Sequence, residues 1–196
     1  MNAHLAGTTP GRYAGSAGGP RIGSLCTGYG GLDLAVELVL GGRLAWYAET
    51  DPHARTVLAH HWPGVPNLGD IRTVDWTRVE PVDILTAGFP CQDISNAGKR
   101  VGITGAHSSV WTAVADAVRA LRPPRLFVEN VAALLRRGLD VVQADLATVG
   151  YDTRWLCLRA SDIGAAHRRD RLFLLASRTD LGRRDDDADP ADAVRP

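Results

Sequence analysis

Short apolar segments that alternate with helical segments constrain the fold of this chain more than any other feature of its sequence. Segments with strand character are predicted at 21–26, 44–48, 82–87, 126–128, 151–159 and 171–176. Helices are predicted between them, at 32–40, 52–61, 109–121 and 139–149. Strands that alternate with helices form a mostly parallel sheet with helices on both faces. The sequence therefore predicts a doubly wound α/β fold with its functional site at the carboxyl ends of the strands.

Composition limits the extent of this domain and the classes of protein to which it can belong. Residues 1–20 predict a disordered leader and 178–196 a polar disordered tail, which leaves 21–177 as the folded domain. The net charge of zero predicts no polyanion partner from charge alone. Three scattered cysteines predict neither a disulfide framework nor a metal site. No segment predicts a membrane span or a signal peptide, so the expected location is the cytoplasm.

A cysteine in a stiff loop after one of the predicted strands is the first candidate for chemistry. Cys91 directly follows Gly88-Phe89-Pro90, just beyond the strand at 82–87. Gly88 lets the backbone turn without a Cβ, and Pro90 fixes its own φ. Most free cysteines are small buried hydrophobic residues. The position of Cys91 instead favours a thiol at the mouth of the sheet, available as a nucleophile.

Glycines and acidic residues at three successive strand ends predict a pocket for a nucleoside-type cofactor. The glycines within 27–31 follow the first strand, where backbone amides can point at a ligand. Glu49 ends the second strand, where a carboxylate can accept hydrogen bonds from ribose hydroxyls. Asp70 is predicted to end the third strand region, where it can accept a hydrogen bond from an exocyclic amine. Each feature alone is also explained by a tight turn or a solvated charge, but the three together favour a ligand.

Charged residues at two later strand ends form a second candidate set with Cys91. Glu129 follows the strand at 126–128, although an acid there can also serve as a charge at a helix N-terminus. Arg169 and Arg171 alternate, so on a strand they share one face. An edge strand protected by charge is the simpler explanation of these arginines.

Together these segments resemble the motifs of the C5-cytosine-specific DNA methyltransferases that use S-adenosyl-L-methionine. The resemblance runs from about Ile22 to Ala176. The segment 88–95, Gly-Phe-Pro-Cys-Gln-Asp-Ile-Ser, is similar to the nucleophile motif and is highly specific. The cofactor motifs of the family are similar to segments 25–33, 49–51 and 69–71. The Glu-Asn-Val motif matches 129–131, and the Gln-x-Arg-x-Arg motif is similar to 167–171.

The resemblance implies a Rossmann-like fold, a mechanism and a set of site residues. Cys91 would add to C6 of a cytosine flipped out of double-stranded DNA, so that C5 accepts the methyl group. Glu129 would hold the N3/N4 edge of the base, and Arg171, supported by Arg169, would contact O2. No metal is required. The implied cofactor-binding residues are Cys26, Thr27, Gly28, Tyr29, Gly30, Gly31, Glu49, Thr50, Asp70, Ile71, Gly88 and Pro90.

The chain also departs from the family's pattern. His167 stands in place of Gln, Ala166 in place of Pro, Cys26 in place of an aromatic residue, and His107 in place of an Arg in the expected mobile loop. Members of the family continue into a target-recognition domain, whereas here only the polar residues 178–196 follow. We therefore interpret the chain as a catalytic half, either truncated or completed by a second polypeptide that supplies the target-recognition domain.

Three alternatives remain beside a DNA methyltransferase of a restriction–modification system. The first is an inactive remnant that binds the cofactor or a partner. The second is a related RNA cytosine methyltransferase. The third is a cysteine hydrolase, which requires a histidine base near Cys91, and no histidine here lies in a local signature for that role.

Overall fold

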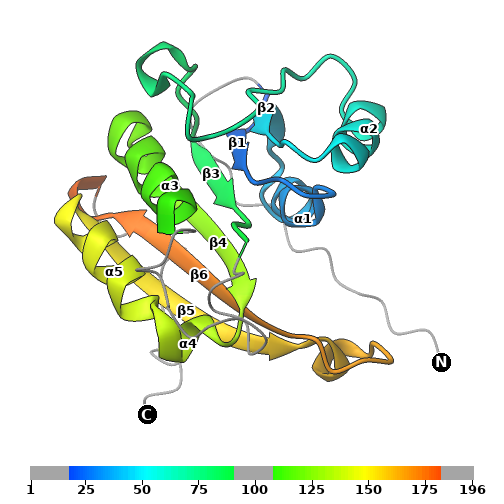
Figure 1. Cartoon of the computed structure of the whole chain (residues 1–196), viewed down its shortest axis with the longest axis vertical. Helices are drawn as coiled ribbons and strands as arrows, with labels where there is room; N and C mark the ends of the chain where they lie inside the picture. Colours follow the sequence, from blue (N-terminus) through cyan, green and yellow to red (C-terminus); the bar gives the residue numbers. More distant parts are fainter. Residues whose placement is uncertain (1–17, 91–107, 182–196) are drawn as a thin grey trace.

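The protein is described by a computed structural model that covers residues 18–90 and 108–181. The predicted leader up to residue 17, the loop 91–107 with Cys91 and His107, and residues 182–196 lie outside the described residues. A six-stranded sheet runs in the order β2-β1-β3-β4-β6-β5 (Figure 1). No helix within the described ranges is long and apolar enough to cross a membrane.

Strands and helices alternate along the chain as predicted. The strands are β1 (Arg21–Leu25), β2 (Arg43–Ala48), β3 (Ile84–Ala87), β4 (Arg125–Val131), β5 (Tyr151–Arg159) and β6 (Asp170–Arg178). The α-helices are α1 (Gly31–Leu40), α2 (Pro52–His61), α3 (Ser108–Leu121), α4 (Leu134–Arg137) and α5 (Leu139–Thr148). The described residues also form the 3₁₀ turns η1 (Trp76–Arg78), η3 (Ala160–Ile163) and η4 (Thr179–Leu181). Regular structure thus continues to Leu181, a few residues past the predicted boundary at 177.

Local signals in the sequence explain where α2 begins and where α1 ends. The side chain of Asp51 accepts a hydrogen bond from the backbone N–H of Ala54 at 2.8 Å, and Pro52 is the first residue of α2. An aspartate cap followed by proline satisfies the free amides of the first turn. Helix α1 ends at Gly41, whose φ of 71° is left-handed and suits glycine. The predicted start of α2 and end of α1 are confirmed.

Strand direction departs from a uniformly parallel sheet at one strand. Strands β2, β1, β3 and β4 pair in parallel, whereas β6 lies antiparallel between β4 and β5. The connection between β5 and β6 holds only η3 and a short loop, and such a connection joins antiparallel strands. This hairpin extends away from the body of the molecule at the lower right of Figure 1.

Two buried clusters cover the two faces of the sheet. Adjacent residues on a strand point to opposite faces, and Ile84 and Leu85 of β3 belong to different clusters. The cluster of Ile84 includes Val36 of α1 and Leu58 of α2. The cluster of Leu85 includes residues of α3 and α5. Helices on both faces, as predicted, therefore hold the sheet and align the ends of β1, β2 and β3 at one edge.

Gly23 in β1 leaves space for an indole ring in the core. A Cβ at this position would lie 2.3 Å from Cζ2 of Trp46 and 2.5 Å from its Cη2. Trp46 is 2% exposed and donates through Nε1 to the carbonyl of Glu80 at 3.0 Å, so its ring cannot retreat freely. We expect Gly23→Ala to lower the free energy of unfolding by about 2–3 kcal/mol, measured by urea denaturation.

Gly31→Ala is the matched control for this substitution. No heavy atom lies within 4 Å of a Cβ built at Gly31, which is the first residue of α1. We expect the control to change stability by less than about 1 kcal/mol. A loss at Gly23 no larger than that of the control would contradict the packing argument.

Candidate functional site

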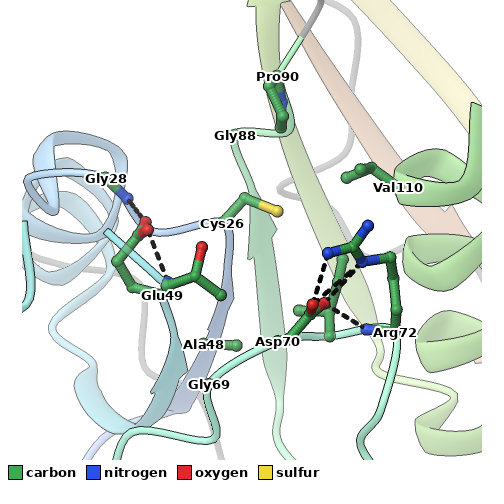
Figure 2. A pocket seen from close by; sticks show the side chains of 12 residues that line it. Cys26, Gly28, Ala48, Glu49, Gly69, Asp70, Arg72, Gly88, Pro90 and Val110 are labelled. Atoms are coloured by element: carbon green, nitrogen blue, oxygen red, sulfur yellow. Dashed lines mark hydrogen bonds and ion pairs between the residues drawn. The ribbon is translucent and has the colours of Figure 1, made fainter. Parts of the chain in front are cut away.

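A cavity of about 460 Å³ lies at the carboxyl ends of β1, β2 and β3 (Figure 2). Its volume falls in the usual range of small-molecule sites, about 300–1,000 Å³. Eight of the predicted cofactor-binding residues line it: Cys26, Gly28, Glu49, Thr50, Asp70, Ile71, Gly88 and Pro90. Segments that are far apart in the sequence meet here because parallel strands present their carboxyl ends at the same edge.

The other predicted cofactor-binding residues shape the loop between β1 and α1 without lining the cavity. Thr27 donates to the carbonyl of Ala48 through its backbone N–H, and its own carbonyl accepts from Gly30 at 3.0 Å. Gly30 has a φ of 80°, and a Cβ there would meet the ring of Trp62 at 2.5 Å. The Tyr29 side chain is 68% exposed. Gly31 begins α1.

Four lining residues were missed by sequence reasoning: Ala48, Gly69, Arg72 and Val110. The first three are next to predicted residues in the sequence, and this adjacency was a signal that could have found them. Val110 lies in α3, where the apolar stripe of the helix predicts a packing role instead. Arg72 matters most, because it brings a positive charge into the cavity.

Backbone amides hold Glu49 in place. Its Oε2 accepts from the N–H of Gly28 at 2.7 Å, and its Oε1 accepts from the N–H groups of Thr50 and Asp51, each at 2.8 Å. Asn67 brackets the same residue, accepting from the N–H of Glu49 at 3.1 Å and donating to its carbonyl at 3.0 Å. A carboxylate has about four acceptor positions, so these contacts leave Glu49 one position for a ligand hydroxyl.

Asp70 does not end a strand, and this part of the prediction is wrong. Only a single bridge, between Tyr47 and Asn67, continues the sheet beyond β2 in the described part of the chain, which then turns through Asp70 and its neighbours. Asp70 still lines the cavity. Arg72 binds both of its carboxylate oxygens, with Nη2 at 2.6 Å from Oδ2 and Nε at 2.9 Å from Oδ1, and this contact lowers the pKa of Asp70.

Cys26 lines the cavity as a thiol. Burial, followed by the nearby charges of Glu49 and Asp70, raises its pKa to about 12, so the sulfur stays protonated at neutral pH. Its φ of 52° is left-handed, which is uncommon for a residue other than glycine. A protonated, half-buried sulfur suits a cavity wall better than a nucleophile.

Glu129 and Arg171 form an ion pair beside this cavity. Arg171 Nε lies 2.6 Å from Glu129 Oε1, and the side chains are 22% and 29% exposed, respectively. Glu129 lies within β4 rather than after it, because β4 continues to Val131 and pairs there with Arg171 of β6. A Cβ at Gly88 would lie 3.5 Å from the Cys26 carbonyl and 3.9 Å from Glu129 Oε2, so Gly88 separates the cavity from the ion pair.

The residues just before Cys91 are firmly held. Phe89 is 5% exposed, packs against Trp111 with ring centroids 5.4 Å apart, and accepts a hydrogen bond from Asn130 Nδ2 at 3.1 Å. Pro90 lines the cavity. Cys91 itself lies outside the described residues.

Arg169 does not share a strand face with Arg171. It is exposed and precedes β6, which begins at Asp170, so the alternation argument does not apply to it. Its predicted supporting role stays a prediction. Among the described residues, no group of three or more His, Cys, Asp or Glu side chains could hold a metal ion.

Comparisons with known proteins match most of this chain. The family model for C-5 cytosine-specific DNA methylase matches residues 21–192. The type II methyltransferase M2.BsuMI from Bacillus subtilis (strain 168) is 33% identical over 165 residues, which cover 80% of this chain and 42% of the relative. M.HhaI from Haemophilus parahaemolyticus, also a type II methyltransferase, is 32% identical over 167 residues, which cover 83% of this chain and 50% of the relative. The chain thus spans half the length of these relatives or less.

Solved structures share the fold. The Entamoeba histolytica methyltransferase EhMeth has a TM-score of 0.70 at 16% identity, covering 80% of this chain and 52% of that one. The S. pombe Dnmt2 methyltransferase has a TM-score of 0.69 at 19% identity, covering 90% of this chain and 58% of that one. The predicted Rossmann-like fold class is confirmed.

Proposed function

The chain belongs to the C-5 cytosine-specific DNA methylase family, and we propose that it transfers a methyl group from S-adenosyl-L-methionine to C5 of cytosine in double-stranded DNA. The observation that carries this proposal is the position of Gly88, which lines the cavity and lies beside Glu129 of the ion pair with Arg171. The nucleophile Cys91 follows Pro90 directly in the sequence.

The donors and acceptors around the cavity fit the cofactor. Glu49 keeps an acceptor position for a ribose hydroxyl, and Asp70 can accept from the exocyclic amine of adenine once its carboxylate is free. Val110 and Ile71 offer apolar surface to the base. When bound, the cofactor supplies an electrophilic methyl group.

The catalytic residues have separate roles in the proposed reaction. The Cys91 thiolate adds to C6 of a cytosine that has left the base stack, which makes C5 a nucleophile toward the methyl group. Glu129 binds the N3/N4 edge of the base, with Oε1 held by Arg171 and Oε2 on the side of Gly88. Arg171 stabilises charge at O2. Loss of the C5 proton to a base then expels the Cys91 sulfur and restores the ring.

Sequence recognition is proposed to come from a second polypeptide. The curated relatives have much more chain than the region matched here. An apolar groove of about 310 Å³ lies on β4, β5 and β6, with Phe127, Leu156 and Phe173 in its lining. Leu156 is 49% exposed and Leu158 is 41% exposed, and neighbouring exposed apolar side chains beside such a groove suit a protein partner.

Covalent capture tests the proposed reaction. The purified chain is mixed with labelled S-adenosyl-L-methionine and DNA that contains 5-fluorocytosine, alone and with the product of the neighbouring reading frame. We expect a denaturant-resistant protein–DNA adduct in at least one of these mixtures, because fluorine at C5 blocks the elimination step. Cys91→Ser should abolish the adduct, whereas Cys157→Ser, at an exposed cysteine outside the cavity, should retain it.

The outcomes separate the proposal from its main alternative. An adduct that survives in Cys91→Ser would contradict the assigned nucleophile. No adduct in either mixture, with cofactor binding retained, would favour an inactive remnant that binds the cofactor. An adduct that forms only with the second protein would support the split enzyme.

A further inference from the structure

The Asp70 carboxylate is largely engaged by its neighbour Arg72. Oδ1 accepts from the backbone N–H of Arg72 at 3.0 Å and from its Nε at 2.9 Å. Oδ2 accepts from Nη2 at 2.6 Å and from the shared Nε at 3.1 Å. A carboxylate has about four acceptor positions, and three N–H groups of Arg72 make these four contacts with them. The Asp70 side chain is 31% exposed and lines the cavity, so a ligand amine that reaches it must compete with Arg72 for the same oxygens.

The two acidic residues of the cavity are held in contrasting ways. Backbone amides of Gly28, Thr50 and Asp51 bind Glu49, and these donors are fixed by the fold. The donors to Asp70 belong largely to a long, flexible side chain that is 55% exposed. The pair is bidentate, but both side chains are partly exposed to solvent, which screens their charges, so the Arg72 guanidinium can leave at a modest cost.

We propose that Arg72 is a movable cover on Asp70 that competes with the exocyclic amine of the cofactor's base. This inference rests on the proposed function and concerns the same cavity. In Figure 2 the guanidinium lies between Asp70 and Val110, on the cavity side of the loop. Arg72 thereby lowers the affinity for ligands with an amine at this position, including the demethylated product, and so helps the product to leave.

A pair of ligands that differ only at the exocyclic group tests the cover. S-Adenosylhomocysteine has an amine there, whereas S-inosylhomocysteine has a carbonyl oxygen that cannot donate. The substitution Arg72→Met keeps the apolar stem and removes all side-chain donors. We expect Arg72→Met to bind S-adenosylhomocysteine roughly 3- to 5-fold more tightly by titration calorimetry, the size expected for freeing an exposed ion pair. It should bind S-inosylhomocysteine no more tightly than the wild type.

Arg55→Met is the matched control, because Arg55 is an exposed arginine of α2 that does not line the cavity. Its affinities for both ligands should equal those of the wild type, and both variants should melt like the wild type. The decisive quantity is the ratio of the affinities for S-adenosylhomocysteine and S-inosylhomocysteine. A purely structural role of Arg72 would leave this ratio unchanged.

Each of the remaining outcomes supports or overturns the proposed role of Arg72. Weaker binding of S-adenosylhomocysteine by Arg72→Met would show that Arg72 holds the ligand, and equal changes for both ligands would show that it acts elsewhere; either result overturns the cover. Binding by the variant but not by the wild type would support it. No binding of S-adenosylhomocysteine by either protein would contradict the proposed function itself, and with it the cover.

Discussion

Glu129→Gln is expected to lower methyl transfer by about 100- to 1,000-fold, because the amide lacks the negative charge that favours a proton at N3, and that proton balances the negative charge that the Cys91 thiolate adds to the ring. Glutamine keeps the shape of the side chain, so the fold should be retained. Glu129 does not line the cofactor cavity, so the affinity for S-adenosylhomocysteine should change by less than about 2-fold. The measurement is transfer of labelled methyl groups to DNA under the conditions in which the wild type is active.

Glu80→Gln provides the matched control, since Glu80 also pairs with an arginine, Arg21, but is 62% exposed. This substitution should leave methyl transfer at the wild-type rate. If Glu129→Gln also kept activity close to that of the wild type, Glu129 would not contact the reacting base. A parallel loss of cofactor affinity would instead indicate that the ion pair with Arg171 shapes the cavity.

Asp33→Asn is expected to change how stability depends on pH. Asp33 of α1 is 1% exposed and accepts hydrogen bonds from Thr86 of β3 and from Ser24 of β1. Burial is the largest cause that raises its pKa from 3.8 to about 6. Because the folded protein holds this proton more tightly than the unfolded chain, stability falls as pH rises from about 4 to about 6 and then levels off.

The full loss is roughly 3 kcal/mol, of which about 2 kcal/mol falls between pH 4.5 and pH 8. The asparagine side chain of the variant cannot ionise, so the difference in unfolding free energy between variant and wild type should shift in favour of the variant by that amount over this range. Urea denaturation at several pH values measures it. A hydrogen bond that the variant loses at every pH lowers its stability by the same amount throughout, so it does not change this shift with pH.

Asp116→Asn, at an exposed aspartate of α3 paired with Arg119, should show no such shift. A difference between Asp33→Asn and the wild type that is constant from pH 4.5 to pH 8 would mean that Asp33 does not change ionisation in this range. The hydrogen bonds of Asp33 with Ser24 and Thr86 connect α1 to β1 and β3. The same experiment therefore measures how much these bonds stabilise the position of the loop that precedes α1.

Much of the fold follows from local signals in the sequence. The alternation of apolar strands and helices predicts the sheet, and Asp51-Pro52 and Gly41 predict two helix ends, because caps depend on neighbouring residues only. The reversed direction of β6 and the loop at Asp70 do not follow from local signals. They depend on which strands pair, and pairing is decided by contacts between distant segments.

The candidate site divides in the same way. The sequence by itself determined the residue types at or near the strand ends, with Glu49 and Gly88 just past their strands and Glu129 inside β4, where a parallel sheet gathers them. Only the tertiary structure decided which of these groups are engaged. It pairs Glu129 with Arg171 across two strands, and it brings the N–H of Gly28 to the carboxylate of Glu49. The physical reason is that a hydrogen bond depends on distance and direction in space, and side chains from separate segments acquire both only when the chain has folded.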